Sequence, residues 1–241
     1  MKNYSRIFVF SFIVAAAFSS LRMEAAEQEG SANHDHHGST VKENQDPTPA
    51  FHKHFKDAKH WAKSFEDPER DKWQKPDEVI KLLGIKAGTV VADLGAGTGY
   101  FSIRMAKAHP EAKIIGADIE PDMVAYLEQQ AQERKLTNLS AYKIDAAKPE
   151  LPAKAGLALM VDTFHHIDNR VDYLKNLAPS LAPKGQVALI DFTKASPIGP
   201  PAKHRIEPEE VIAQFKAAGY DLQKRFDDLP NQYFLLFQKH E

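Results

Sequence analysis

From residue 89 onward, the apolar residues fall into short segments of two kinds. Short apolar runs predict buried strands, and apolar residues spaced three and four apart predict helices that cover them. The expected strands are 89–94, 113–117, 139–144, 157–163, 186–192, 220–226 and 233–238, and the expected helices are 99–108, 121–135, 168–177 and 208–218. Strands and helices in this order predict an α/β fold, a three-layer sandwich around a largely parallel sheet.

Two further helical patterns precede the first strand. Five apolar residues share one face of an expected helix that ends at Pro68: Phe51, Phe55, Ala58, Ala62 and Phe65. A second helix is expected from Pro76 to Leu83, with Gly84 closing it. We therefore expect an N-terminal helical extension over residues 51–75, followed by the α/β domain over residues 76–241.

Residues 1–26 have the composition of a secretory signal peptide. Lys2 and Arg6 precede an apolar run from Ile7 to Leu21, which only serines interrupt and small residues follow. The run is shorter than the about 20 apolar residues of a comfortable membrane span, and an uncleaved N-terminal anchor is the alternative. Both readings predict an exported domain, periplasmic or extracellular, that touches a membrane only through an uncleaved N-terminal segment.

Residues 27–50 are rich in polar residues, glycine and proline, and are expected to form a linker without a fold of their own. Three histidines in it, His34, His36 and His37, form a weak candidate site for a divalent metal. A solvated polar linker with only adventitious metal affinity explains the same composition. No other metal site is expected.

Composition and charge exclude several classes of function. The chain of 241 residues has no cysteine, which rules out disulfides, thiolate metal sites and cysteine nucleophiles. Its 31 basic and 33 acidic side chains leave a net charge of -2. Nucleic-acid binding is therefore not expected, because it depends on clustered Lys and Arg.

A glycine-rich loop follows the first predicted strand and opens a helix. Residues 93–99 read Asp-Leu-Gly-Ala-Gly-Thr-Gly, and glycine there lets the backbone turn sharply and approach a ligand. Asp118, Asp145 and Asp162 end the next three strands, so four carboxylates are expected at one edge of the sheet. An acid before the loop suits a cationic ligand such as S-adenosylmethionine better than a pyrophosphate. The glycine spacing also disfavours a nicotinamide oxidoreductase.

These segments resemble the motifs of class I S-adenosylmethionine-dependent methyltransferases of the small-molecule branch, in an exported variant. The likeness runs from residue 76 to 238 and rests on 90–100, 116–123, 145–146, 161–167 and 181–186. It implies a Rossmann-like, mostly parallel seven-stranded sheet with helices on both faces. The implied cofactor-binding residues are Asp93, Gly95, Ala96, Gly97, Gly99, Tyr100, Asp118, Ile119, Asp145, Ala146 and Asp162.

The helical extension is expected to act as a lid over the cofactor, as in related methyltransferases, with Arg70 pairing with the methionine carboxylate. His165 and His166 follow the fourth strand, beside the expected methyl group, and one of them is a candidate base. Because neighbouring side chains on an extended chain point opposite ways, we expect the other to pack or hydrogen-bond. His204 and Arg205 are candidates for holding an anionic acceptor.

The sequence therefore predicts methyl transfer from S-adenosylmethionine to an unidentified small molecule. A second hypothesis is an exported methyltransferase-like protein that has lost catalysis and binds or senses a ligand. Binding of the cofactor, followed by transfer to an acceptor, distinguishes the two.

Overall fold

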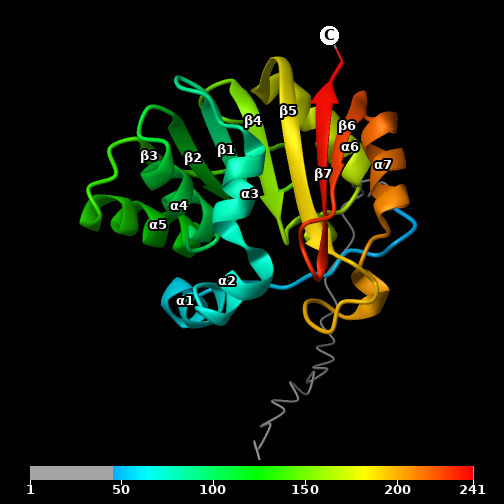
Figure 1. The fold of residues 1–241 in the computed structure, drawn as a ribbon, viewed down its shortest axis with the longest axis horizontal. Helices are drawn as coiled ribbons and strands as arrows, with labels where there is room; N and C mark the ends of the chain where they lie inside the picture. Colours follow the sequence, from blue (N-terminus) through cyan, green and yellow to red (C-terminus); the bar gives the residue numbers. More distant parts are fainter. Residues whose placement is uncertain (1–45, 241) are drawn as a thin grey trace, which may run out of the picture. The chain divides into compact units, whose positions relative to one another are not determined.

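The structure is a computed structural model that describes residues 46–240 (Figure 1). The expected signal peptide and most of the expected linker, including His34, His36 and His37, lie outside the described residues. None of the helices within residues 46–240 is long and apolar enough to cross a membrane.

The described domain is built on a seven-stranded sheet of order β3-β2-β1-β4-β5-β7-β6 (Figure 1). The first five strands in the sequence run parallel, and β7 pairs antiparallel with both β5 and β6. The strands are β1 Val90–Leu94, β2 Lys113–Asp118, β3 Leu139–Lys143, β4 Ala155–Val161, β5 Leu181–Phe192, β6 Tyr220–Phe226 and β7 Gln232–Lys239. The predicted Rossmann-like sandwich is confirmed.

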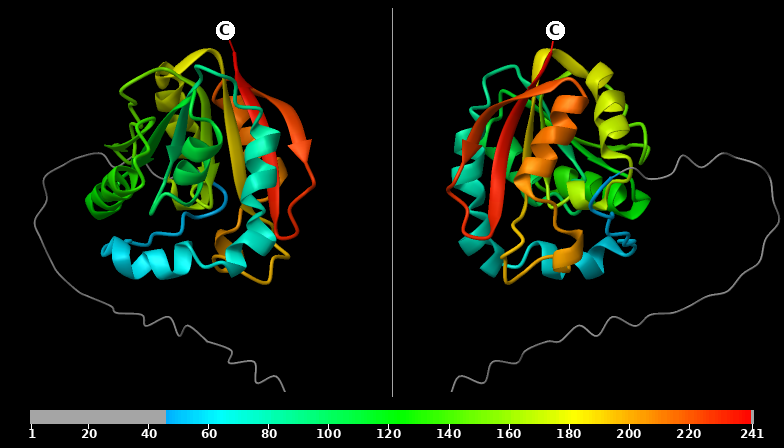
Figure 2. Two further views of the ribbon diagram at one scale, coloured as in Figure 1. Left: turned by 60° about the vertical axis from the view of Figure 1, so that its left-hand side comes forward. Right: turned by 90° about the vertical axis from the view of Figure 1, so that its right-hand side faces the viewer.

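Helices cover both faces of the sheet (Figure 2). The helices are α1 Ala58–Phe65, α2 Glu69–Gln74, α3 Pro76–Leu83, α4 Tyr100–Ala108, α5 Pro121–Glu133, α6 Arg170–Leu177 and α7 Pro208–Ala217. One apolar core joins the sheet to α3, α4 and α5, and a second joins its other face to α6 and α7. This division gives the three layers expected when each helix buries one apolar stripe.

The N-terminal extension departs from its predicted form. The apolar spacing predicts a helix from Phe51, but residues 46–57 are an irregular chain, called the strap below, and α1 begins only after it. The backbone N–H of Phe51 donates to the carbonyl of His165 at 2.8 Å, a pairing that competes with helix formation. Asp57 caps α1 by accepting the N–H of His60. Residues 46–50, expected in the linker, are therefore part of the packed domain.

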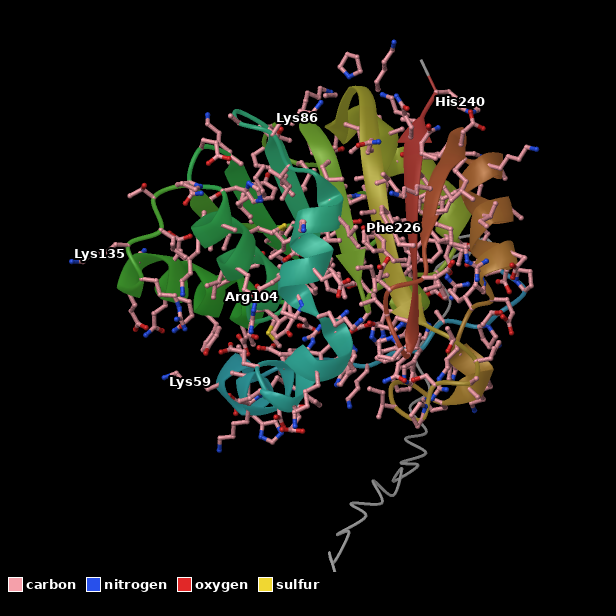
Figure 3. The ribbon with its side chains drawn as sticks, viewed as in Figure 1. Lys59, Lys86, Arg104, Lys135, Phe226 and His240 are labelled. Carbon is pink, nitrogen blue, oxygen red and sulfur yellow. The ribbon has the colours of Figure 1, made fainter. Side chains whose placement is uncertain are left out.

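The short helix α2 has no counterpart among the predicted elements. Its six residues are mostly charged or polar, so they show no apolar periodicity. Tertiary contacts hold it instead: Arg104 of α4, labelled in Figure 3, forms an ion pair with Asp71, and the two atoms lie 3.0 Å apart. The 3₁₀ turns η1 Phe164–His166, η2 Ala178–Ser180 and η3 Ala202–His204 complete the structure of the described residues.

Two glycines allow α5 to pack closely on the sheet. The side chain of Leu127 is almost fully buried, and a Cβ on Gly116 would lie 2.3 Å from its Cδ2 atom. A Cβ on Gly99, in the glycine loop, would lie 2.4 Å from its other methyl group. One leucine therefore fixes the distance between α5, β2 and the loop.

Replacing Gly116 with alanine is expected to destabilise the domain by about 1–3 kcal/mol through overpacking against Leu127. Equilibrium urea unfolding measures the change. Gly156→Ala is the matched strand control, because its Cβ would meet no atom closer than 3.2 Å. Equal stability of the two variants would contradict this account of the packing.

Candidate functional site

The carboxyl ends of the five parallel strands bring five aspartates to one edge of the sheet. They are Asp93 in β1, Asp118 in β2, Asp145 after β3, Asp162 after β4 and Asp191 in β5. Four of them were predicted. Asp191 was not, although it stands one residue before the end of its strand, as Asp93 does.

The glycine loop adopts a conformation that only glycine takes readily. Gly95, Gly97 and Gly99 have φ angles of 76°, 54° and 94°. A Cβ on Gly95 would lie 2.4 Å from the hydroxyl oxygen of Thr163, so this turn has no room for a side chain. Ala96 is buried under the loop, and Tyr100 begins α4 directly behind it.

Asp118 fixes this loop to the neighbouring strand. Its Oδ2 accepts the N–H of Gly97 at 2.8 Å, and its Oδ1 accepts the N–H of Glu120 at 2.9 Å. Burial raises the pKa of Asp118, and these backbone hydrogen bonds oppose the rise. The carboxylate is thus oriented by backbone donors at the edge of the glycine loop.

A pocket of about 390 Å³ opens beside Asp118. It is lined by Ile119, Lys143, Ile144, Asp145 and Ala146. Ile119 is 47% exposed, an unusual position for a large apolar side chain. Asp145 accepts the N–H groups of Ala147 and Lys148, which lower its pKa and fix its orientation. The pocket therefore offers an apolar wall and one oriented carboxylate, which suits a flat ring with a polar edge.

Asp93 lies beneath the loop and is buried. Its Oδ2 accepts the hydroxyl of Ser102 at 2.6 Å, and burial raises its pKa to about 6. Burial lowers the pKa of Arg70, and the charge of the nearby Asp93 carboxylate opposes this change. Asp93 thus supplies negative potential under the loop without an ion-pair partner in direct contact.

Arg70 reaches the sheet edge from α2, as expected for a residue of the lid. Its Nη2 lies 3.3 Å from Asp162 Oδ2 and also donates to Gln74. Gln74 donates to Gln232 at 2.7 Å, and Gln232 donates back to Asp162. The guanidinium carbon lies 4.0 Å from the centre of the Tyr100 ring. Its pairing with a methionine carboxylate stays a prediction, and within the described residues its partner is Asp162.

Asp162 is held in an uncommon backbone conformation with φ 55°. Burial raises its pKa to about 7, and Arg70 opposes the rise. Asp162 and Arg70 therefore form a compensated pair rather than two free charges.

His165 forms a buried pair with Asp191. Its Nδ1–H donates to the carboxylate at 2.8 Å, and its backbone N–H donates to the same group at 3.2 Å. Burial lowers the pKa of His165, but the charge and hydrogen bond of Asp191 outweigh it, so the pKa is raised overall. This geometry fixes the imidazole and makes it more basic.

His166 is only partly buried and lies in different surroundings. Its Nδ1–H donates to the carbonyl of Phe51 in the strap, which leaves Nε2 with its lone pair. Burial and the neighbouring His165 lower its pKa to about 4, so the ring is neutral near pH 7. The two imidazoles do not point in opposite directions, as expected for an extended chain. Their ring centres lie 4.2 Å apart, because η1 is a 3₁₀ turn.

Five rings in mutual contact, called the ring layer below, extend from His166 to the glycine loop. They are Phe51, Phe55, Trp61, Phe65 and His166. Successive ring centres are 5.1 to 5.6 Å apart. At the far end, the Phe65 ring lies 3.4 Å from the position that a Cβ would take on Gly97. The strap and α1 thus place aromatic surface directly beside the glycine loop.

The structure corrects the role expected for Arg205. Its guanidinium is buried and donates to the backbone carbonyls of Pro200, Lys194 and Ser196. These bonds, made by Nε and Nη1, hold the loop after β5, so the guanidinium has a structural role in place of the expected acceptor contact. Its neighbour His204 bonds to the carbonyl of Pro49 in the strap.

Metal binding finds no support within residues 46–240. Among these residues, no group of three or more histidines and acidic side chains is placed to hold a metal ion. The weak candidate at His34, His36 and His37 stays a prediction outside the described residues.

The buried position of Asp93 has a measurable consequence for stability. Because its pKa rises from 3.8 to about 6 on folding, the folded state holds its proton more tightly. This stabilisation, about 3 kcal/mol, is complete below pH 4 and lost as the pH rises through 6. Asp93→Asn is expected to remove that component, so the variant gains on the wild type between pH 4 and 7. Urea unfolding across this range tests it, and a pH-independent difference would contradict it.

Comparison with known proteins identifies the family. A family model described as "Methyltransferase domain" matches residues 85–226. A demethylmenaquinone methyltransferase of Listeria welshimeri is 32% identical over 127 residues, 51% of this chain and 52% of that protein. Phosphoethanolamine N-methyltransferase 1 of Triticum aestivum is 28% identical over 149 residues, 60% of this chain and 27% of that protein. The chain thus spans about half or less of the length of these relatives.

Among solved structures, a SAM-dependent methyltransferase from Aquifex aeolicus has the same fold. Its TM-score is 0.70 at 24% identity, over 76% of this chain and 99% of that one. The family match covers more than half of the 241 residues, including the glycine loop and the strands that carry the five aspartates. The chain therefore belongs to the methyltransferase-domain family.

Proposed function

We propose that this protein is an S-adenosylmethionine-dependent methyltransferase that acts on a small-molecule acceptor. The observation that carries the proposal is the arrangement at the end of β2. There one carboxylate, Asp118, is fixed to the glycine loop beside a pocket with an exposed apolar wall. This is the geometry that a nucleoside needs, with the ribose at the acid and the base in the pocket.

The described residues fit the parts of this cofactor. The backbone at Gly95 is exposed, so a ligand can approach the chain closely there. Thr98 has a buried hydroxyl without a hydrogen-bond partner in the same loop. Ile119 and Asp145 offer an apolar face and an acceptor for an adenine ring. Asp93, which has no ion-pair partner in direct contact among the described residues, gives the cationic end of the cofactor a negative surrounding.

When bound, the cofactor supplies an electrophilic methyl group on a sulfonium. The chain's own residues then position the partners, which is the main requirement of an in-line displacement. His166 is the proposed base for an acceptor that carries a proton, because its Nε2 lone pair is free near pH 7 and its ring lies in the ring layer. Its lowered pKa makes it a weak base, so we expect it to accept the proton as the methyl group is transferred and not beforehand. His165, held by Asp191, is the proposed support that fixes this turn.

The relatives favour a small molecule as acceptor. Their names give demethylmenaquinone and phosphoethanolamine as the molecules they methylate. We carry over to this chain only the size class, because these two acceptors differ in charge and in shape.

We also propose that residues 1–26 direct export, on the evidence of the basic start and the apolar run alone. Fractionation of cells that express the full chain tests this. Recovery outside the cytoplasm, with a shortened N-terminus or an intact anchor, is the expected result. Cytoplasmic recovery of a chain that retains Met1 would contradict it.

Asp118→Asn is expected to weaken binding of S-adenosylhomocysteine about ten- to a hundred-fold, because a charge-assisted acceptor is lost. Calorimetric titration of the full chain measures this. Asp221→Asn is the matched control, since Asp221 pairs with His240 at the opposite end of the sheet. Equal affinity of Asp118→Asn and wild type would contradict the proposed ribose site.

A turnover assay of the wild-type chain distinguishes an enzyme from the non-catalytic alternative. A chain that binds the cofactor and forms S-adenosylhomocysteine in the presence of an acceptor is a methyltransferase. Cofactor binding without turnover across a panel of acceptors would favour the sensing protein.

A further inference from the structure

The ring layer is an accessible surface. Each of its five members is neither buried nor fully exposed, so each keeps part of its surface in contact with solvent. Phe51 stacks on His166 with 26° between the ring planes, and Trp61 stacks on Phe65 with 28°. Phe55 contacts both pairs edge-on, at 84° to His166 and 79° to Trp61. The layer thus presents both faces and edges of aromatic rings beside the glycine loop.

Three basic side chains of this region offer little to an anion. Arg70 is paired with Asp162 and also donates to Gln74 and to the carbonyl of Phe65. Arg205 donates through Nε and Nη1 to the backbone carbonyls of its own loop. His166 is neutral near pH 7 because its pKa is lowered to about 4. Lys53, whose ammonium lies over the Trp61 ring, is only partly buried, and a solvent-exposed ion pair compensates little of the hydration that an anion loses. A phosphate or carboxylate on the acceptor would therefore find no buried counter-charge among these residues.

A cation is disfavoured for a different reason. Trp61 in the layer and Tyr100 in α4 already carry the chain's own cations. The Lys53 ammonium lies 4.4 Å from the centre of the Trp61 ring, and the Arg70 guanidinium lies 4.0 Å from that of Tyr100. A second cation beside either would meet like charge.

We propose that the ring layer binds the acceptor, and that the acceptor is an uncharged, planar aromatic molecule. This inference rests on the proposed function and narrows it, because it names the chemical class that the aromatic surface and the compensated charges accept. An aromatic acceptor packed against the exposed part of Phe55 would then lie beside His166, whose ring contacts Phe55 edge-on.

The test uses three probes that share one ring system and differ in charge: 2-naphthol, 2-naphthyl phosphate and 2-naphthylmethylamine. Each is titrated by calorimetry into the full chain at pH 7, with and without saturating S-adenosylhomocysteine. We expect 2-naphthol to bind about ten-fold or more tightly than either charged probe, because only it avoids burying an unpaired charge.

Two variants tie this binding to the ring layer. Phe55→Ala is expected to weaken 2-naphthol binding about five- to ten-fold, whereas Phe55→Tyr, which keeps the ring, restores it. Neither is expected to change the affinity for S-adenosylhomocysteine, which also shows that the variants fold. Leu222→Ala removes an exposed apolar side chain on the edge strand β6 and serves as the control.

The two proposals can fail separately. A charged probe that binds as tightly as 2-naphthol, or 2-naphthol binding that Phe55→Ala leaves unchanged, would overturn the acceptor class. Absence of S-adenosylhomocysteine binding by the wild type would instead overturn the proposed function. The three naphthalene probes are also titrated without S-adenosylhomocysteine, so the acceptor class is still tested in that case.

Discussion

The structure depends on how five carboxylates are accommodated at one edge of a parallel sheet. The fold directs the ends of β1 to β5 to the same edge, and each end carries an aspartate. Repulsion and burial would make this arrangement costly unless each group found its own donors. Asp118 and Asp145 accept backbone N–H groups, Asp93 a hydroxyl, Asp162 a guanidinium and Asp191 an imidazole. The different partners give these chemically identical side chains different roles.

The N-terminal segment is part of this solution. Arg70 of α2 compensates Asp162, and Phe51 of the strap fixes the tautomer of His166 through its carbonyl. The same segment contributes four of the five rings beside the glycine loop. Lys59 of α1 points away from the domain, consistent with an apolar inner side and a charged outer side for this helix (Figure 3). The segment therefore acts as a wall of the site.

The strands, most helices and the glycine loop were predictable because their signals are local. Alternating periodicities set the order of the elements, and the convergence of parallel strand ends then placed four aspartates together. The form of the strap and the role of Arg205 were not predictable, because they depend on contacts between segments distant in the sequence. The pattern of Phe51 and Phe55 is helical, yet pairing of residue 51 with residue 165 keeps the strap extended. The sequence suggested Arg205 as a cation for an acceptor, but only the fold shows that it donates to the carbonyls of Pro200 and Ser196.

The most direct test of the account is a crystal structure of the protein with S-adenosylhomocysteine. The account predicts the ribose hydroxyls within hydrogen-bond distance of Asp118, the adenine ring against Ile119, and the thioether sulfur facing the ring layer. A ligand bound elsewhere, or an adenosyl group turned away from Asp118 in a folded and saturated protein, would contradict it.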